Sequence, residues 1–295
     1  MAKQQLVSRQ YMKRSRSGEV WHRLKKNKGA MAGLAIIIIL ALVAIFANLL
    51  VDYENQVIGM TLKDRLQHPS RQHIMGTDDL GRDIFARLIY GSRFSLSVGV
   101  VAVAIAVVSG VILGAFAGYY SGGIVEDIIM RFTDIFAAVP NMLMAIVIVS
   151  ALGANTVNLM ISVGVTSIPQ FVRTTRAAVL TVTGQEYIES ARAIGESETK
   201  IIFKHILPNC LSPIIVRITL RVSSAIISAS SLSFLGLGVP APNPEWGSML
   251  STGRAYLRGH SYMTLFPGLA IMITVLAFNM VGDGLRDAMD PKLKR

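Results

Sequence analysis

The side chains best placed to recognise another molecule lie in one polar segment, Gly184–Pro208. Thr183 and Glu186 have the spacing of a capping box, in which a hydroxyl and a carboxylate bond to the free amides at a helix start. Gly195 suits the position just past the end of that helix, where the backbone turns left-handed. The segment is therefore predicted to begin with a short helix that ends at a glycine.

This first helix carries one apolar face, made by Tyr187, Ile188, Ala191 and Ile194. Ser197 is expected to cap a second short helix, and Pro208 is expected to stop it. Two short helices joined at a glycine are less typical of a linker than of an element that docks on a partner protein. The pattern favours docking on a partner, and packing against the membrane interface stays the alternative.

The sequence contains no recognisable set of catalytic residues. The sequence contains no Gly-x-x-x-x-Gly-Lys-Ser/Thr phosphate loop, so we expect no ATP hydrolysis by this chain. Its five histidines have no paired metal-ligand spacing, and its single cysteine, Cys210, excludes an intrachain disulfide. We therefore expect no enzyme activity, no cofactor and no metal site.

Two arginines, Arg217 and Arg221, lie four residues apart on one face of a predicted membrane helix. Arg221 lies about 12 Å along the helix from Pro213, and an arginine at that depth is costly on a lipid-facing surface. Both side chains could snorkel to the headgroups. For Arg221 we favour a place on a translocation path or against a partner subunit, where it could attract a peptide carboxylate.

The elements that must position these residues are membrane helices. The chain has 295 residues, of which 52% are hydrophobic and only 16% are charged. A bilayer core needs about 20 apolar residues as a helix. Four charge-free windows hold one span each, and a fifth holds two short spans divided at Gly153–Thr156. The windows are Gly29–Val51, Phe94–Val125, Ile135–Val172, Val222–Pro244 and Gly259–Gly282. The expected fold is an all-α polytopic membrane protein with six transmembrane helices.

The charge distribution indicates the orientation and argues against nucleic acid as a partner. The net charge is +11, but nine of the Lys and Arg residues lie within 1–28, directly before the first span. This is the positive-inside pattern, which predicts that both termini are cytoplasmic. The segment 52–92 disagrees, because it is expected outside and yet holds five basic residues. We also expect an uncleaved anchor, since the basic tail is too long for a signal peptide.

The chain is divided as follows: a basic tail (1–28), a first span (29–51), an extracytoplasmic segment (52–92), a five-helix core (93–285) with the polar segment at 184–208, and a cytoplasmic tail (286–295). Within 52–92, Gly76–Asp83 predicts a tight turn followed by a short amphipathic helix at the interface. Pro140 and Pro169 are expected inside the third and fourth spans, as kinks.

Six strings of residues carry a resemblance to a known family. Glu189, Ser190 and Ala191, with Gly195 and Leu207-Pro208 at fixed spacing, resemble the Glu-Ala-Ala loop of binding-protein-dependent ABC importer permeases. Ser190 replaces an alanine there. His205 stands where many members have isoleucine. Phe203–Asn209 instead resembles the Phe-x-His-Ile-Leu-Pro-Asn string that is frequent in the peptide-transport branch of the family. The other strings, Gly76–Asp83, Tyr120–Arg131 with Asp134, Leu235–Gly238, Pro244–Gly247 and Ala277–Pro291, resemble the second permease subunit of dipeptide, oligopeptide and nickel importers.

The resemblance implies a type I ABC importer permease fold in a bacterial or archaeal plasma membrane. It implies four partners besides lipid: a second permease subunit, two cytoplasmic ATPase subunits and an extracellular or periplasmic substrate-binding protein. It also implies that the short helix lies in a groove on an ATPase, where Glu189 pairs with the ATPase or caps its own helix. Peptides are the first cargo expected, with nickel or another small solute as the alternative.

Two other classes of membrane protein are less consistent with the sequence. A self-contained secondary transporter predicts an acidic relay within the membrane and inverted repeats. The apolar windows contain no acidic residue, and Asp127, Asp134 and Asp283 lie near predicted span ends. A membrane-embedded enzyme needs a nucleophile–base pair or a metal set inside the bundle, and the sequence offers neither.

Overall fold

The computed structural model describes residues 16–290, and the regular secondary structure of this part of the chain is helical, as expected. Its β structure is limited to one isolated bridge between Thr77 and Asp83. The α-helices are α2 (Arg16–Lys26), α3 (Lys28–Ile45), α4 (Ala47–Leu50), α5 (Ile84–Tyr119), α6 (Ile124–Ala138), α7 (Asn141–Leu152), α8 (Thr156–Val165), α9 (Ile168–Thr183), α10 (Glu186–Ala193), α11 (Glu198–Lys200), α12 (Leu207–Phe234), α13 (Trp246–Gly253) and α14 (Tyr262–Met289). Most of the basic tail, at 1–15, lies outside the described residues.

Four helical segments in residues 16–290 are long and apolar enough to cross a membrane: α3, α5, α14 and the segment from α11 through α12. The pair α6 and α7 makes a fifth if it counts as one span, although it is bent by 92°. The expected number of six is therefore not confirmed by helix length. The window Ile135–Val172 contains no uninterrupted helix of membrane length, because α7 and α8 have only 12 and 10 residues.

The prolines expected inside two spans lie instead where helices begin. Pro140 precedes α7 at the sharp bend after α6. Pro169 lies in the first turn of α9. A proline lacks the backbone N–H that an interior helical position must donate, whereas the first turn does not need it. The expectation of proline kinks within continuous helices was therefore wrong, and these residues mark breaks between short helices.

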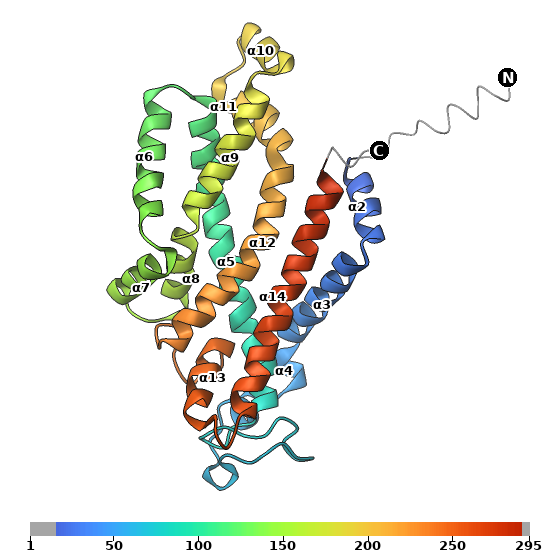
Figure 1. Cartoon of the computed structure of the whole chain (residues 1–295), viewed down its shortest axis with the longest axis vertical. Helices are drawn as coiled ribbons and strands as arrows, with labels where there is room; N and C mark the ends of the chain where they lie inside the picture. Colours follow the sequence, from blue (N-terminus) through green and yellow to red (C-terminus); the bar gives the residue numbers. More distant parts are fainter. Residues whose placement is uncertain (1–15, 291–295) are drawn as a thin grey trace, which may run out of the picture.

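The 36-residue helix α5 runs through the centre of the bundle and packs closely on α9 (Figure 1). Glycine makes this packing possible. A Cβ atom at Gly114 would lie 2.6 Å from the carbonyl oxygen of Val172, and one at Gly118 would lie 2.7 Å from the Cβ atom of Val179. Small residues four apart thus let the two backbones approach directly, as in other membrane helix pairs.

The turn Gly76–Asp83 leads straight into α5, and no separate interfacial helix follows it. Asp83 caps α5 by accepting a hydrogen bond from the amide of Ala86 at 2.9 Å. The apolar residues after the turn are simply the first turns of this long helix. The expectation of a short amphipathic helix was wrong because the sequence pattern did not reveal that the helix continues past Ser92.

Two of the basic residues that conflict with the positive-inside rule are buried and paired. The Nε atom of Arg82 bonds to Asp78 at 2.7 Å, and Arg87 lies 3.6 Å from the same carboxylate. Arg87 also donates to the carbonyl of Val57 at 2.8 Å. These guanidinium groups hold the segment together, so they do not count as free positive charge on that side of the membrane.

Helix α10 and the segment between α4 and α5 lie at opposite ends of the molecule (Figure 1). Helix α10 lies at one end, and the N-terminal helix α2 and the last turns of α14 lie toward that same end. The segment between α4 and α5 and the short helix α13 lie at the other end. The two ends of the described chain are therefore on the same side as α10, which agrees with an even number of crossings.

Candidate functional site

The helix expected after Gly184 is α10, and its end matches the sequence prediction. Gly195 has a φ of +79°. Its amide bonds to the carbonyl of Arg192 at 3.0 Å, and the amide of Glu196 bonds to that of Ala191 at 3.1 Å. This pair of bonds is a Schellman motif, which requires the left-handed conformation that glycine adopts without strain.

The start of α10 differs from the predicted capping box. The N-cap residue is Gln185, and its side chain makes no capping bond. Helix α9 extends as far as Thr183, so the Thr183 hydroxyl donates to the carbonyl of Leu180 at 3.3 Å within its own helix. The capping box was therefore wrong, because the residue expected to begin one helix still belongs to the preceding one.

The predicted apolar face of α10 divides into a buried half and an exposed half. Ile188 is fully buried and Ala191 is nearly so, whereas Tyr187 is 44% and Ile194 is 81% exposed. The buried pair packs on one apolar cluster that joins α5, α9 and the start of α12. Its other members include Ala115, Val179, Ile201, Ile202 and Ile206. Helix α10 is thus fixed to the ends of the membrane helices.

The second short helix does not stop at Pro208. Ser197 occupies the N-cap position of α11, but its side chain makes no capping bond. Helix α11 continues through a π-helical stretch, Ile201–Ile206, into α12. Leu207 bonds to the carbonyl of Ile202, five residues back, and Pro208 fits the next position because it has no N–H to donate. The predicted helix end was wrong for this reason.

Polar contacts also hold the segment after Gly195. Glu196 bonds to Lys200 at 2.5 Å and to His205 at 2.6 Å. These bonds, first the one from Lys200 and then the one from His205, lower the pKa of the Glu196 carboxyl below its ordinary value. The arrangement gives His205 a structural role that sequence analysis missed. The signal was the spacing of Glu196 and Lys200, four residues apart, with a histidine one turn further on.

Two residues at the end of α5 brace the segment from the other side. The hydroxyl of Tyr120 donates to Glu198, and the guanidinium of Arg192 lies 5.0 Å from the centre of the Tyr119 ring. The carboxylate of Glu198 raises the pKa of Tyr120 above its ordinary value. Together with the buried apolar cluster, these contacts make α10 and α11 one rigid projection on the bundle.

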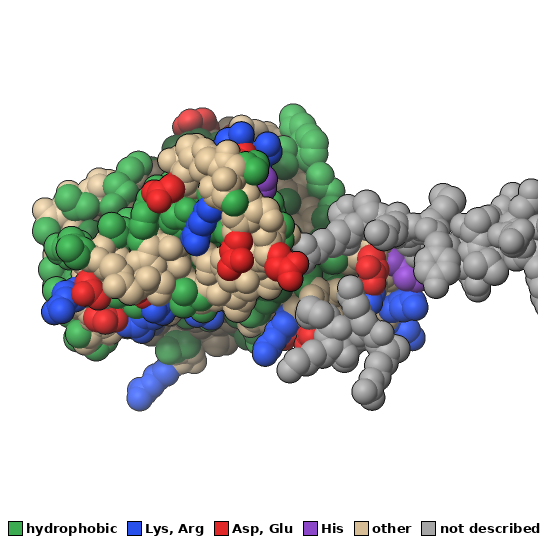
Figure 2. All heavy atoms as spheres, turned by 90° about the horizontal axis from the view of Figure 1, so that it is seen from above, with side chains coloured by type: hydrophobic (Ala, Val, Ile, Leu, Met, Phe, Trp, Pro, Cys, Tyr) green, Lys and Arg blue, Asp and Glu red, His purple; other side chains and the backbone are tan. Residues whose placement is uncertain are grey.

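Glu189 and Ser190 lie on the exposed side of this projection. The Ser190 hydroxyl donates to the carbonyl of Glu186 at 2.9 Å. Within residues 16–290 the Glu189 carboxylate has no hydrogen bond and no ion pair, so it does not cap its own helix. Seen from this end, the molecule presents acidic, basic and hydrophobic side chains interspersed over one surface (Figure 2).

The two arginines of α12 have different surroundings. Arg221 is only 9% exposed. Its Nε and Nη2 atoms lie 3.0 and 2.7 Å from the hydroxyl of Ser167, and Nη1 lies 3.3 Å from that of Ser224. Arg217 is exposed and lines a groove of about 660 Å³ between α9, α12 and α14. Their expected place on a translocation path stays a prediction.

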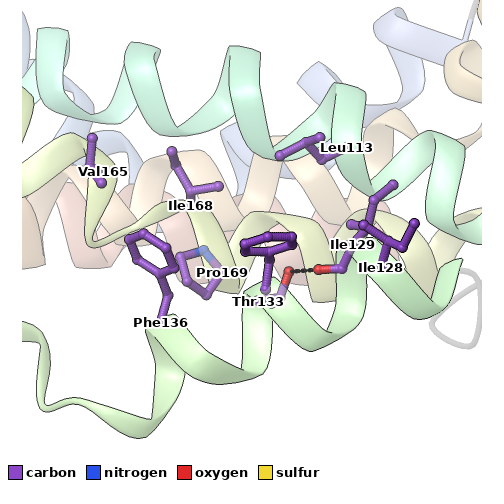
Figure 3. A pocket seen from close by; sticks show the side chains of 9 residues that line it. Leu113, Ile128, Ile129, Thr133, Phe136, Val165, Ile168 and Pro169 are labelled. Atoms are coloured by element: carbon purple, nitrogen blue, oxygen red, sulfur yellow. Dashed lines mark hydrogen bonds between the residues drawn. The ribbon is translucent and has the colours of Figure 1, made fainter. Parts of the chain in front are cut away.

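A second pocket, of about 380 Å³, lies between α6 and the helices α5, α8 and α9 (Figure 3). Its lining is apolar, with side chains such as Leu113, Phe136 and Ile168 pointing into it. Its one hydroxyl, on Thr133, is already bonded to the carbonyl of Ile129 at 2.7 Å. This pocket suits hydrocarbon and offers no group for the charged ends of a peptide.

Three histidines lie at the end of the molecule opposite α10, and they form no metal site. The ring of His68 lies 4.9 Å from that of His260, and His73 bonds to Asp83 at 2.8 Å. No group of three His, Cys, Asp or Glu side chains in the described residues is arranged to hold a metal ion. Cys210 is buried in the apolar cluster beneath α10.

Comparison with known families identifies two matching regions. Residues 110–295 match the family described as binding-protein-dependent transport system inner membrane component. Residues 15–69 match the N-terminal transmembrane domain of oligopeptide transport permease C. The first match contains the projection made by α10 and α11, and the groove between α9, α12 and α14.

Individual relatives cover almost the whole chain. It is 48% identical to a dipeptide transport system permease protein of Alkalihalophilus pseudofirmus, over 94% of this chain and 90% of the relative. It is 41% identical to a di/tripeptide transport system permease protein of Pseudomonas aeruginosa, over 94% and 92%. It is 46% identical to a glutathione transport system permease protein of Escherichia coli O157:H7, over 94% and 90%.

The fold resembles that of a solved ABC transporter. An inward-facing structure of the MetNI methionine ABC transporter matches with a TM-score of 0.57 at 18% identity. The match covers 69% of this chain and 97% of the other. At this identity the likeness concerns the fold, and it supports the type I importer permease architecture expected from the sequence.

Proposed function

We infer the function from one premise: the chain belongs to the family of binding-protein-dependent transport system inner membrane components. It is a multi-pass permease subunit of an ABC importer. We propose that its cargo is a short peptide, of two or a few residues. The proposal is supported by relatives at 41–48% identity, which are permease proteins of dipeptide, di/tripeptide and glutathione transport systems.

The proposed complex contains a second, different permease subunit, two cytoplasmic ATPase subunits and an extracellular substrate-binding protein. The chain would supply half of the translocation path, and the ATPases would supply the energy. No nucleic acid is involved in this scheme, and the surrounding partner is membrane lipid. Both termini and α10 would face the cytoplasm, which is supported by the place of α2, the last turns of α14 and α10 toward the same end of the molecule (Figure 1).

The observation that carries the proposed coupling is the way α10 is attached. A docking element must transmit force, so it needs a rigid base and an open contact face. Ile188 and Ala191 join α10 to the ends of α5, α9 and α12, while Glu189 and Ser190 stay exposed. We propose that this exposed face docks on an ATPase, and that movement of the ATPases on ATP binding moves α9 and α12 together.

The other positions of the Glu-Ala-Ala loop have supporting roles in this proposal. Gly195 makes the sharp turn out of α10, and Leu207 and Pro208 lie where the π-helical stretch becomes α12. A movement of α10 would therefore reach α12 through one continuous helical segment, Glu198–Phe234. In this proposal the two residues direct that movement and need no contact with the ATPase.

Reconstitution tests the proposal. The assembled complex in proteoliposomes should take up radiolabelled dipeptide with ATP and binding protein, and should lose uptake when either is omitted. The purified chain alone should neither hydrolyse ATP nor transport. Uptake by the chain alone, or by the chain with ATPases but without a sister permease, would contradict the proposed assembly. Uptake of other solutes without any uptake of peptide would contradict the proposed cargo.

A further inference from the structure

The groove between α9, α12 and α14 is lined by two unpaired arginines from different helices. Arg217 projects from α12, and Arg286 projects from the last turns of α14. Both are exposed, and neither has a hydrogen bond or an ion pair within the part of the chain that the structure describes. By contrast, Arg173 and Arg176 of the neighbouring α9 each bond to a carboxylate of α6.

Acidic residues do not neutralise this groove. Asp290 is its one acidic lining residue, and Asp290 already has an interaction of its own. Asp283 and Asp287 of α14 are exposed and do not line the groove. The net effect is a positive site between two helices at the end of the molecule that carries α10.

Arg221 adds to this positive charge from one turn deeper in α12. It is buried, and its hydrogen bonds go to the hydroxyls of Ser167 and Ser224. Hydroxyl groups satisfy the guanidinium donors but carry no compensating charge. Two like charges four residues apart on a helix repel each other, so an anion bound beside Arg217 would relieve that repulsion.

The rest of the lining suits a peptide. Ser212 contributes a hydroxyl that can bond to a peptide N–H or C=O group. The Thr174 hydroxyl and the Asn209 amide already donate to the carbonyls of Gln170 and His205, and their oxygens can still accept from a peptide N–H. The lining on α12 runs from Asn209 to Leu220, which is about 16 Å at 1.5 Å per residue. An extended chain advances about 3.5 Å per residue, so a di- or tripeptide fits along it.

We propose that Arg217 and Arg286 bind the C-terminal carboxylate of the cargo peptide in this groove, on the cytoplasmic half of its path. The proposal rests on the proposed peptide cargo. The recognised chemistry is an anionic oxygen pair, which guanidinium groups bind in a forked geometry. An anionic lipid headgroup presents similar oxygens, and the test below separates the two sources.

The test uses the assembled transporter in proteoliposomes and compares Arg217→Gln and Arg286→Gln with the parent. The cargoes are a dipeptide and the same dipeptide with an amidated C-terminus, measured with one binding protein throughout. Each variant should lower kcat/KM for the free acid about tenfold, since a hydrogen bond to a charged group is lost. Uptake of the amide should stay within about twofold of the parent's own value. Arg131→Gln, which removes an exposed arginine of α6 outside the groove, is the matched control.

The outcomes distinguish the possible errors. If both cargoes fall equally in the two variants, the arginines act on structure or coupling, and the proposal is wrong. It is also wrong if the free-acid loss appears only in vesicles with phosphatidylglycerol and vanishes in phosphatidylcholine, because the anion is then a headgroup. If the parent complex transports no peptide while its ATPases respond to another cargo, the proposed function itself fails.

A second readout follows binding without transport. In a Cys210→Ser background, Ser212→Cys places a thiol on the groove lining. The free dipeptide should slow its reaction with a charged thiol reagent in the detergent-solubilised complex, whereas the amide should not. Arg217→Gln should remove this protection. Equal protection by both cargoes would overturn the proposed carboxylate contact.

Discussion

Arg221 donates two hydrogen bonds to the hydroxyl of Ser167, at 3.0 and 2.7 Å, although 54 residues separate them. Ser167 lies between α8 and α9, and its own hydroxyl donates to the carbonyl of Val163 at 2.6 Å. The contact therefore ties the middle of α12 to the break between two short helices. A buried cation thereby links the helix after α10 to the one before it.

The energetics of this contact give a first prediction. In Ser167→Ala the buried guanidinium loses the acceptor of two hydrogen bonds, which should cost about 1.5–3 kcal/mol of stability. In the double variant Ser167→Ala, Arg221→Leu no buried charge remains without a partner. We expect the double variant to unfold at a higher temperature than Ser167→Ala, measured by thermal unfolding of the complex in detergent. A double variant that is less stable than either single one would contradict this account.

The same arginine has a predicted place on the translocation path. If Arg221 contacts the cargo as well as Ser167, Arg221→Leu should impair uptake of a free dipeptide more than uptake of the amidated form, with normal assembly. If its role is only to tie helices together, both cargoes should be affected equally. Uptake of the two cargoes in proteoliposomes decides this. Parental uptake of both would exclude the path assignment.

The charge-free windows predicted correctly that the fold is helical, because a charge-free segment in a bilayer has few alternatives to a helix. It did not predict where helices break. Pro140 and Pro169 were placed inside spans, and they begin new helices, because a window of apolar residues does not reveal a bend of 92°. The same limit explains the turn after Gly76, which leads directly into the 36-residue helix α5.

Within the candidate site, the sequence predicts the local backbone conformation better than it predicts the surroundings of side chains. Gly195 was placed correctly, since a left-handed residue after a short helix favours glycine. Thr183, Ser197 and Pro208 were misplaced, because each depends on how far a neighbouring helix extends. The division of the apolar face between Ile188 and Ile194 could not be predicted, since it requires knowing which helices lie beneath α10.

Charge reversal on α10 tests its proposed contact with an ATPase. Glu189 and Glu186 both lie near the start of α10 and are exposed, so a lysine at either position disturbs the helix dipole by a similar amount, about 0.3–1 kcal/mol. We expect Glu189→Lys to abolish ATP-dependent uptake and Glu186→Lys to retain most of it. The measurement is uptake together with retention of the ATPase on purification. Equal effects of both variants would mean that Glu189 has no specific contact.

Glycine substitution tests the close approach of a partner to the turn. Within residues 16–290, a Cβ atom at Gly195 or at Gly184 would meet no atom within 4 Å beyond the adjacent residues. Only Gly195 is left-handed, where a side chain costs about 1–2 kcal/mol, less for asparagine and aspartate. Gly195→Asp should leave the chain inserted yet remove substrate-stimulated ATP hydrolysis, whereas Gly184→Asp should keep most of it. Gly195→Asn adds a side chain of similar size without a charge, so it separates the effect of backbone strain from the effect of the aspartate charge.

The hydrogen bonds of Glu196 give a prediction about pH. Because Lys200 and His205 lower the pKa of this carboxyl, its contribution to stability is present above its ordinary pKa of 4.5 and is lost as the pH falls through the lowered value. The turn between α10 and α11 should therefore stay ordered at neutral and mildly acidic pH and loosen below pH 4.5. A spin label at Thr199→Cys, in a Cys210→Ser background, reports its mobility. Glu196→Gln keeps the shape of the side chain but not its charge, so its label should be mobile at neutral pH and change little on acidification. If parent and variant respond alike from pH 7 down to a pH below the lowered pKa of Glu196, the bonds to Lys200 and His205 do not hold the turn.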